Sequence, residues 1–184
     1  MTGHIIIKCG SLCREKDDNW VWKRLCQKLG EYSEELKGKL SDTQLPQSKQ
    51  ELSYIVKILR QYVNDTVYLI VDDYQECASV TLDNLIMEVV DNIDNIHIVL
   101  ISRILPYNIP YEAMFLKGQS VLITQQDLKL TKDEEKVIFK ENEINLTAEE
   151  ADLLYEHTDG WISAVYLSLY EYKKLGRMGG FLSV

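Results

Sequence analysis

The sequence has few of the residues that interrupt regular structure. Its 184 residues include only three prolines and nine glycines, which excludes a collagen-like repeat and argues against disorder or a long linker. No apolar run approaches the ~20 residues of a membrane span, and the early run Ile5–Ile7 is far too short for the apolar core of a signal peptide. We therefore expect a cytoplasmic protein with no membrane association, built as one domain or as one domain with a small appendage.

Histidine, cysteine and positive charge are also scarce. The three histidines and four cysteines do not have the spacing of a zinc site, so we expect reduced thiols without a metal. No Ser-His-Asp or Cys-His arrangement stands out either. Lys and Arg number 20 against 29 Asp and Glu, a net charge of −9. Because an acidic surface repels phosphate backbones, this chain is a poor candidate for binding nucleic acid by itself.

Two largely apolar runs predict buried strands. They are Val67–Val71 and Ile96–Ile101, and the amphipathic pattern over Leu82–Ile93 predicts a helix between them. Strand, helix and strand in this order form a parallel crossover unit, and the lack of alternation in Val67–Val71 indicates a strand covered on both faces. Shorter strands are expected at Ile5–Lys8 and Ser120–Thr124.

Helices are predicted by three- and four-residue apolar spacing and by capping signals at their starts. One pattern begins at Asp18 and continues to Leu36. Capping boxes, in which a Ser or Thr precedes a Glu by three positions, open three more helices: Ser48 with Glu51, Thr131 with Glu134, and Thr147 with Glu150. A last helix is expected over 160–175. The predicted organisation is an α/β domain over 1–125 followed by a small helical subdomain over 126–184.

The acids Asp72 and Asp73 directly follow the predicted strand Val67–Val71. In open α/β sheets, ligands bind beyond the carboxyl ends of the strands. An apolar strand that ends in two acids is typical of a Walker B segment, in which the first carboxylate holds Mg²⁺ and the second orients a water molecule. The neighbouring predicted strand ends in Ser102-Arg103, and this arginine is placed to contact a terminal phosphate.

Simpler interpretations of the same residues remain open at this point. The two acids are equally compatible with a loop start, and Arg103 with an ordinary surface position. The sequence also contains no G-x-x-x-x-G-K-[ST] segment. The nearest approach, Lys37-Gly38-Lys39-Leu40, lacks the upstream glycine and the closing hydroxyl, so no phosphate-binding loop is predicted.

The order of these segments resembles the nucleotide-binding domain of MalT-like regulators. The resemblance spans roughly residues 4–175 and rests on these segments: Asp18-Asn19 before Trp22, Tyr68–Tyr74 with its Asp-Asp pair, Asn95–Arg103, Gln126–Thr131 with the following Glu134-Glu135, and Thr158-Asp159-Gly160-Trp161. The family comprises LuxR-type transcription activators of the STAND class of signalling ATPases. It implies a P-loop-NTPase-like, mostly parallel sheet flanked by helices, followed by a helical lid.

The resemblance also implies roles for individual residues. Asp72 would hold Mg²⁺, Asp73 would act as the catalytic residue that orients water, and Arg103 would contact the γ-phosphate of ATP. Gly160 and Trp161 would lie on the adenine side of the nucleotide. The family has a proline where this chain has isoleucine after Trp161, which leaves open the alternative that Trp161 is a core anchor of the last helix.

Compared with the family, the first strand and its phosphate loop have no counterpart here. We therefore expect a fragment of a longer regulator in which ATP and Mg²⁺ bind, with neither held tightly by this fragment and no ATPase activity of its own. The parent would contact DNA only through a domain absent here. A sheet without its first strand would have a gap before Ser120–Thr124, closed within the chain or filled by self-association through unpaired edges. The alternative is a non-catalytic protein–protein interaction module on a degenerate NTPase fold.

Overall fold

The computed structural model describes residues 4–9 and 18–176. The chain divides into two compact units, Met1–Ala113 and Met114–Val184. The first contains a parallel sheet with flanking helices, and the second is helical. Each is described by itself below.

The sheet of the first unit has three parallel strands in the order β1-β2-β3. They are β1 (His4–Cys9), β2 (Thr66–Val71) and β3 (Ile96–Leu100). Strand β2 is central: Tyr68 is paired with Ile6 on one side and with His97 on the other. The predicted parallel sheet flanked by helices is thus confirmed for this unit, and the strand–helix–strand crossover is present.

The helices of the first unit follow the predicted apolar patterns with one correction. They are α1 (Asp18–Gly30), α2 (Glu34–Leu40), α3 (Lys49–Tyr62), η1 (Tyr74–Glu76) and α4 (Val80–Asn92). The short helix α5 (Tyr111–Leu116) contains the boundary between the two units. The pattern from Asp18 to Leu36 was expected to form one helix, but Ser33 starts a new helix because its side chain accepts a hydrogen bond from the Leu36 amide. The predicted capping box at Ser48 is confirmed.

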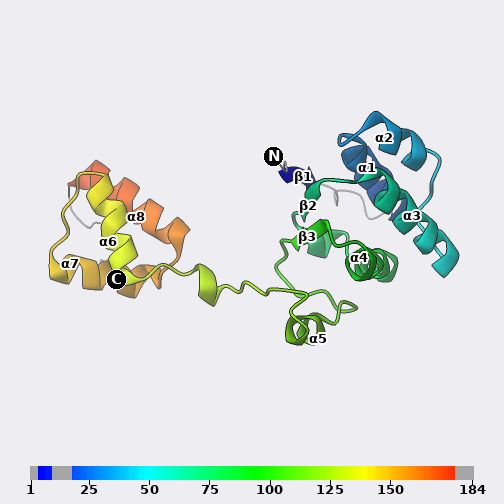
Figure 1. Cartoon of the computed structure of the whole chain (residues 1–184). Coiled ribbons are helices and arrows are strands. Elements are labelled where there is room, and N and C mark those ends of the chain that lie inside the picture. Colours follow the sequence, from blue (N-terminus) through cyan, green and yellow to red (C-terminus); the bar gives the residue numbers. More distant parts are fainter. Residues whose placement is uncertain (1–3, 10–17, 177–184) are drawn as a thin grey trace. The chain divides into compact units, whose positions relative to one another are not determined.

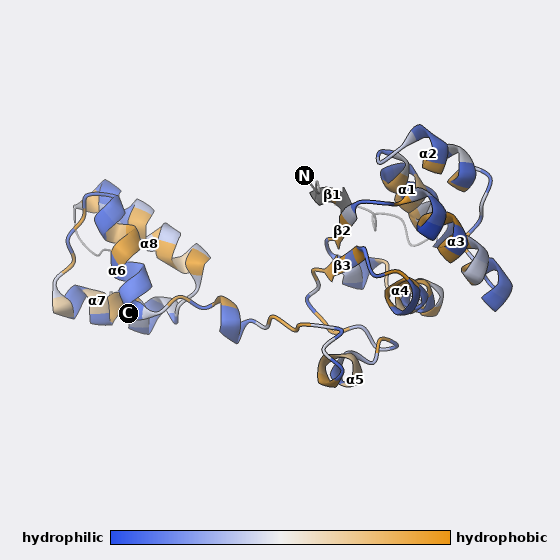
Figure 2. Cartoon of the chain, viewed as in Figure 1, coloured by the Kyte–Doolittle hydropathy of each residue, from blue (hydrophilic) through white to orange (hydrophobic). Residues whose placement is uncertain are grey.

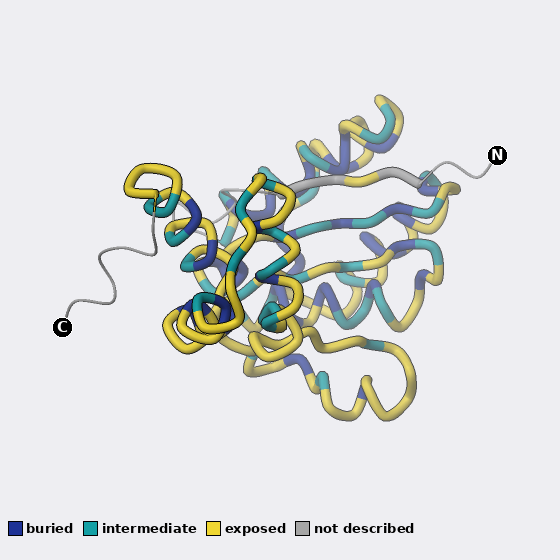
Figure 3. The backbone as a smooth tube through the Cα atoms, turned by 90° about the vertical axis from the view of Figure 1, so that its left-hand side faces the viewer, coloured by how far each residue is buried: buried dark blue, intermediate teal, exposed yellow. Residues whose placement is uncertain are grey.

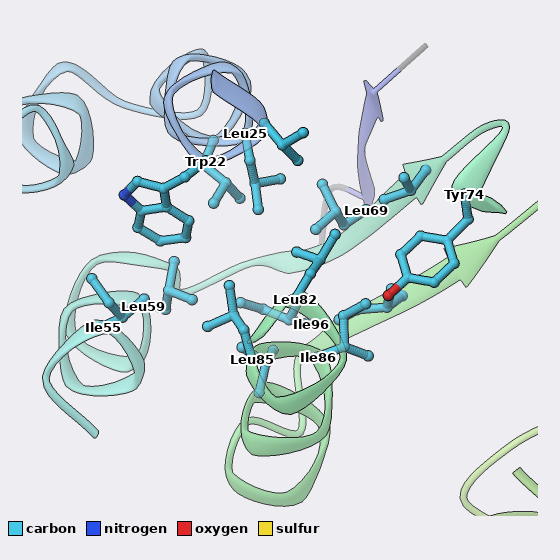
Figure 4. Close-up of a pocket in the computed structure, with 15 residues that line it drawn as sticks. Trp22, Leu25, Ile55, Leu59, Leu69, Tyr74, Leu82, Leu85, Ile86 and Ile96 are labelled. Carbon is cyan, nitrogen blue, oxygen red and sulfur yellow. The ribbon is translucent and has the colours of Figure 1, made fainter. Parts of the chain in front are cut away.

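The core of the first unit lies between one face of the sheet and the helices α1, α3 and α4, which Figure 1 shows on the same side of the strands. Trp22 on α1 is the largest fully buried side chain, and its indole Nε1 donates to the Thr43 carbonyl oxygen at 3.2 Å. Figure 4 shows apolar side chains from these helices and from the sheet pointing toward one another. They line a cavity of about 40 Å³, which is an apolar packing void rather than a site for a polar ligand.

The opposite face of the sheet is open among the described residues, which corrects the expectation that both faces are covered. Along β2, buried residues alternate with half-buried ones, and in β3 His97 and Val99 are exposed (Figure 3). The Tyr68 ring lies against the His97 ring on this face, with centroids 4.9 Å apart. An uninterrupted apolar run therefore does not establish two-sided burial here.

The predicted strand at Ser120–Thr124 is wrong. The chain between α5 and the second unit's helices has no regular structure over these residues, although Figure 2 shows it to be apolar. Val121 and Ile123 are 84% and 66% exposed. Their β-branched side chains favour a strand, but no described strand pairs with them, so the expected gap in the sheet does not arise and β3 is at the edge of the described strands.

Three helices form the second unit after a short turn, η2 (Gln126–Leu128). They are α6 (Lys132–Glu141), α7 (Ala148–Thr158) and α8 (Ile162–Leu175). Both predicted capping boxes of this unit are present. The helices bury a cluster of Phe139, Leu154, Val165 and Leu169. Within the described parts of both units, no helix has the length and apolar character needed to cross a membrane.

The expectation of reduced thiols is confirmed for Cys26 but not for Cys77. Cys26 is free and buried beside Thr43, and burial raises the pKa of its thiol to about 12. Cys77, by contrast, is disulfide-bonded. The expectation is therefore corrected for Cys77.

We expect Trp22→Ala to lower the free energy of unfolding by about 3–5 kcal/mol, because it leaves a large cavity in the main core. Urea unfolding followed by circular dichroism measures the loss. Tyr54→Ala is the control, since Tyr54 is 56% exposed and its replacement should cost less than about 0.5 kcal/mol. Equal losses in the two variants would contradict the position assigned to Trp22.

Candidate functional site at the carboxyl edge of the sheet

The acids Asp72 and Asp73 leave the carboxyl end of β2 in a tight turn. Asp73 has a left-handed backbone with φ of 51°, a conformation that Asp tolerates better than most residues. The Asp73 amide donates to Asp72 Oδ1 at 2.9 Å. Both side chains are exposed, while the next residue, Tyr74, is buried. The turn therefore presents two carboxylates to solvent between a buried strand and a buried aromatic ring.

The end of β3 lies beside this turn. The Ile101 amide donates to the Val71 carbonyl and the Tyr74 amide donates to the Ile101 carbonyl, both at 2.9 Å. Parallel pairing thus continues beyond the last residue of β3 and brings Ser102 and Arg103 to the same edge as the two acids. This is the juxtaposition that the crossover unit predicted.

Gln75 connects the two strand ends through its side-chain amide. Its Nε2 donates to Asp73 Oδ1 at 3.0 Å. Its Oε1 accepts from the Ser102 hydroxyl at 3.1 Å and from the Arg103 amide at 3.0 Å. Arg103 is exposed, and its guanidinium forms no ion pair with any residue the structure describes. The arginine is therefore held by its backbone, with its charged group available to a ligand.

A buried polar cluster connects the residue after the two acids to α4. Asp83 on α4 is 1% exposed and accepts hydrogen bonds from the Tyr74 hydroxyl and, at 3.0 Å, from Asn108 Nδ2. Both carboxylate oxygens therefore have a donor, as a buried carboxylate requires. Burial, followed by the neighbouring Asp83, raises the pKa of the Tyr74 hydroxyl, so this proton stays in place at neutral pH. The cluster anchors the acidic turn to α4.

The donor set at this edge fits a magnesium ion. Asp72 and Asp73 each have one oxygen engaged by a described donor, and the other oxygen of each accepts no hydrogen bond from a described residue. Magnesium is commonly bound by one or two carboxylates together with water and phosphate oxygens. No group of three or more His, Cys, Asp or Glu side chains is arranged for a metal in residues 4–9 and 18–176. The two acids would thus need phosphate or water to complete the coordination.

The other two predicted site residues, Gly160 and Trp161, belong to the second unit. Gly160 has φ of +77°, and an added Cβ would lie 2.5 Å from the Leu130 carbonyl oxygen. The Leu130 amide donates to the Gly160 carbonyl at 2.8 Å, and Lys129 pairs with Asp159 beside it. Only glycine fits this close approach. Trp161 is 43% exposed, so the alternative that it is a core anchor is wrong.

The residues that support the sheet edge and the turn at Gly160 and Trp161 were not predicted from the sequence. Gln75 has no sequence signal, because its role depends on where β3 ends. Asp83 carries a weak signal, since it is an acid next to Leu82 on the apolar face of a predicted helix. Glu135 was noted only as part of a family resemblance, yet it is 1% exposed and accepts from the Thr158 hydroxyl.

Comparison with known proteins adds no assignment. The chain matches no model of a known protein family, and no curated protein matches it. The function must therefore be argued from the site itself.

Asp83→Ala should lower the free energy of unfolding by about 1–3 kcal/mol, because it leaves the buried Tyr74 hydroxyl without an acceptor. In a Tyr74→Phe background the same substitution should cost less, since no orphaned hydroxyl remains. Urea unfolding of the two single variants and the double variant provides the comparison. An equal cost of Asp83→Ala in both backgrounds would show that the two side chains are not coupled.

We expect Gly160→Ala to be more destabilising than Gly176→Ala. Both glycines have positive φ, but nothing lies within 4 Å of a Cβ at Gly176. Gly176→Ala therefore measures the backbone cost alone, roughly 1–2 kcal/mol. The clash with the Leu130 carbonyl should add about 1–3 kcal/mol in Gly160→Ala. Thermal unfolding of both variants measures the difference, and equal stabilities would refute the close approach at Gly160.

Proposed function

We propose that this chain is part of the ATP-binding regulatory switch of a MalT/LuxR-type transcription regulator, a STAND-class ATPase with a P-loop-NTPase-like sheet. The observation that carries the proposal is the position of Asp72, Asp73 and Arg103 at one edge of a parallel sheet, joined through Gln75. Ligand sites of open α/β sheets lie at this edge.

Each residue of the edge has a distinct task under this proposal. Asp72 holds Mg²⁺, which when bound neutralises the phosphate charge that two carboxylates would otherwise repel. Asp73 accepts a hydrogen bond from a water molecule and orients it. Arg103 donates to the terminal phosphate, for which a planar guanidinium is well suited. For Gly160 and Trp161 of the helical unit, the adenine-side role stays a prediction from the family resemblance.

In such a switch, ATP favours one conformation of the longer regulator and hydrolysis resets it. Two carboxylates and one arginine do not position a triphosphate without backbone amides and a lysine around its β- and γ-phosphates. The proposal therefore requires a phosphate-binding loop from a segment outside this sequence. The isolated 184-residue chain is expected to bind ATP weakly and to show no steady turnover.

A second candidate function is a non-catalytic module that binds a protein partner. It is favoured by the open face of the sheet around His97 and Val99 and by the edge position of β3 among the described strands. Parallel sheets are usually covered on both faces, and free strand edges support self-association. This candidate assigns no role to Mg²⁺ or to Arg103.

The direct test is titration of Mg·ATP into the longer regulator that carries this chain, by isothermal calorimetry. Asp72→Ala should weaken Mg·ATP binding roughly tenfold or more by removing a metal ligand. Asp94→Ala is the matched control, because Asp94 is an exposed acid at the opposite, amino end of β3.

Unchanged affinity and turnover in Asp72→Ala would remove the proposed metal role. The interaction module predicts no saturable Mg·ATP binding in any of the three proteins. A G-x-x-x-x-G-K-[ST] segment in the preceding coding sequence would favour the switch, and its absence would favour the module.

A further inference from the structure

Glu135 is a buried acid whose hydrogen bonding is incomplete. It lies in the first half of α6 and is 1% exposed, whereas its neighbour Glu134 is exposed and completes the capping box with Thr131. The Thr158 hydroxyl donates to Glu135 Oε1. The second oxygen, Oε2, is buried and has no hydrogen-bond partner among the described residues. A fully ionised carboxylate in this position would lack half of its required donors.

No described cation compensates a charge on Glu135. The charged side chains on the surrounding helices and turns are either exposed or paired with other groups. The paired groups include Lys132 with Asp152, Lys136 with Asp133 and Lys129 with Asp159, and His157 on α7 is exposed. Glu171 on α8 is the exception, because it is half-buried and its Oε2 has no described hydrogen-bond partner, but it is an acid and supplies no positive charge. An uncompensated buried charge costs far more than a neutral carboxyl group in the same place.

Burial therefore determines the protonation of this group. Loss of hydration raises the pKa of the Glu135 carboxyl above its ordinary value of 4.5. The Thr158 hydroxyl and the Gly160 backbone N–H act in the opposite direction but do not offset the effect of burial. The neutral acid is favoured in the folded unit more than in an unfolded chain.

Glu135 touches the turn that contains Gly160 and Trp161. Thr158, the last residue of α7, is buried and its hydroxyl donates to Glu135. The same hydroxyl accepts from the Gly160 amide at 3.4 Å. The Trp161 amide donates to the Thr158 carbonyl at 2.9 Å. A displacement of Thr158 is therefore transmitted to both residues that follow.

We propose that Glu135 is a positioning residue that holds the turn Thr158–Trp161 against α6 in its protonated form. This inference deepens the proposed function, on which it rests for the assignment of Gly160 and Trp161 to a nucleotide. Ionisation places an unpaired charge inside the helical unit, and the turn moves to admit water to the carboxylate. The position of Gly160 and Trp161 consequently depends on pH.

Proton-detected ¹H–¹⁵N NMR of the full chain tests this inference without nucleotide. The Gly160 amide resonance is followed from about pH 4 to about pH 8, a range that spans ordinary and raised carboxyl pKa values. We expect it to titrate with a midpoint above 4.5, the ordinary value. Glu135→Gln, which mimics the neutral acid, should abolish the titration and keep the low-pH resonance position. Glu141→Gln, an exposed acid on the same helix, should behave as the wild type.

Thr158→Val supplies a second variant. It removes a donor that favours the charged form, so the Gly160 midpoint should shift upward from the wild-type value. The raised pKa of Glu135 also determines how the unfolding free energy changes with pH. Relative to Glu135→Gln, the wild type should lose unfolding free energy as pH rises from 4.5 through the folded-state pKa.

A Gly160 resonance that is independent of pH in the wild type would overturn the inference. This measurement uses the wild-type chain, so it does not depend on whether a variant folds. Persistence of the same titration in Glu135→Gln would also overturn it. Because no nucleotide is present, failure of Mg·ATP binding in the longer regulator would refute the proposed function and leave the Glu135 result standing.

Discussion

Parallel pairing between β2 and β3 is the constraint on which the candidate site depends. Two parallel neighbours with the same register end at the same edge of a sheet, and here the pairing extends through Ile101 to Tyr74. Asp72 and Arg103 are therefore brought to one edge by their backbones, without a direct contact between their side chains. The one-sided apolar core includes Val71, just before the two acids, and Tyr74, just after them, so packing of the core fixes the geometry of the edge. An edge of this kind keeps its charged groups free for a ligand.

Local signals in the sequence were sufficient for most of the elements and for the edge itself. Capping boxes and apolar periodicity depend on residues within one or two turns, and the crossover between two apolar runs implied that Asp72 and Arg103 end close together. Signals that depend on distant partners failed. Ser33 divides a continuous helical pattern, and Ser120–Thr124 has a strand composition but no partner strand among the described residues. Gln75 could not be predicted, because its amide is functional only once two strand ends are adjacent.

Each unit contains a buried carboxylate, and the two differ in how many of their oxygens accept a hydrogen bond. Asp83 has a donor for each oxygen, one from Tyr74 and one from Asn108, and such a group is a fixed structural element. Glu135 has a donor for only one oxygen. A half-satisfied buried acid is costly when charged, and the cost is avoided by taking up a proton. The difference in hydrogen bonding thus leaves the second unit with a buried acid whose contacts depend on its protonation, because burial raises the pKa of Glu135.

The electrostatics of the edge decide what a bound phosphate would require. Two exposed carboxylates repel a polyphosphate, and Arg103 alone does not reverse their combined charge, so an anion at this edge needs a metal ion and further donors. The open face of the sheet beside this edge, where Val99 is exposed, also lacks the covering layer that parallel sheets usually have. Additional polypeptide next to β3 would meet both requirements at once, by covering apolar surface and by presenting backbone amides. The ATP switch and the interaction module therefore share one physical condition, and they differ in whether the added segment also carries a phosphate-binding loop.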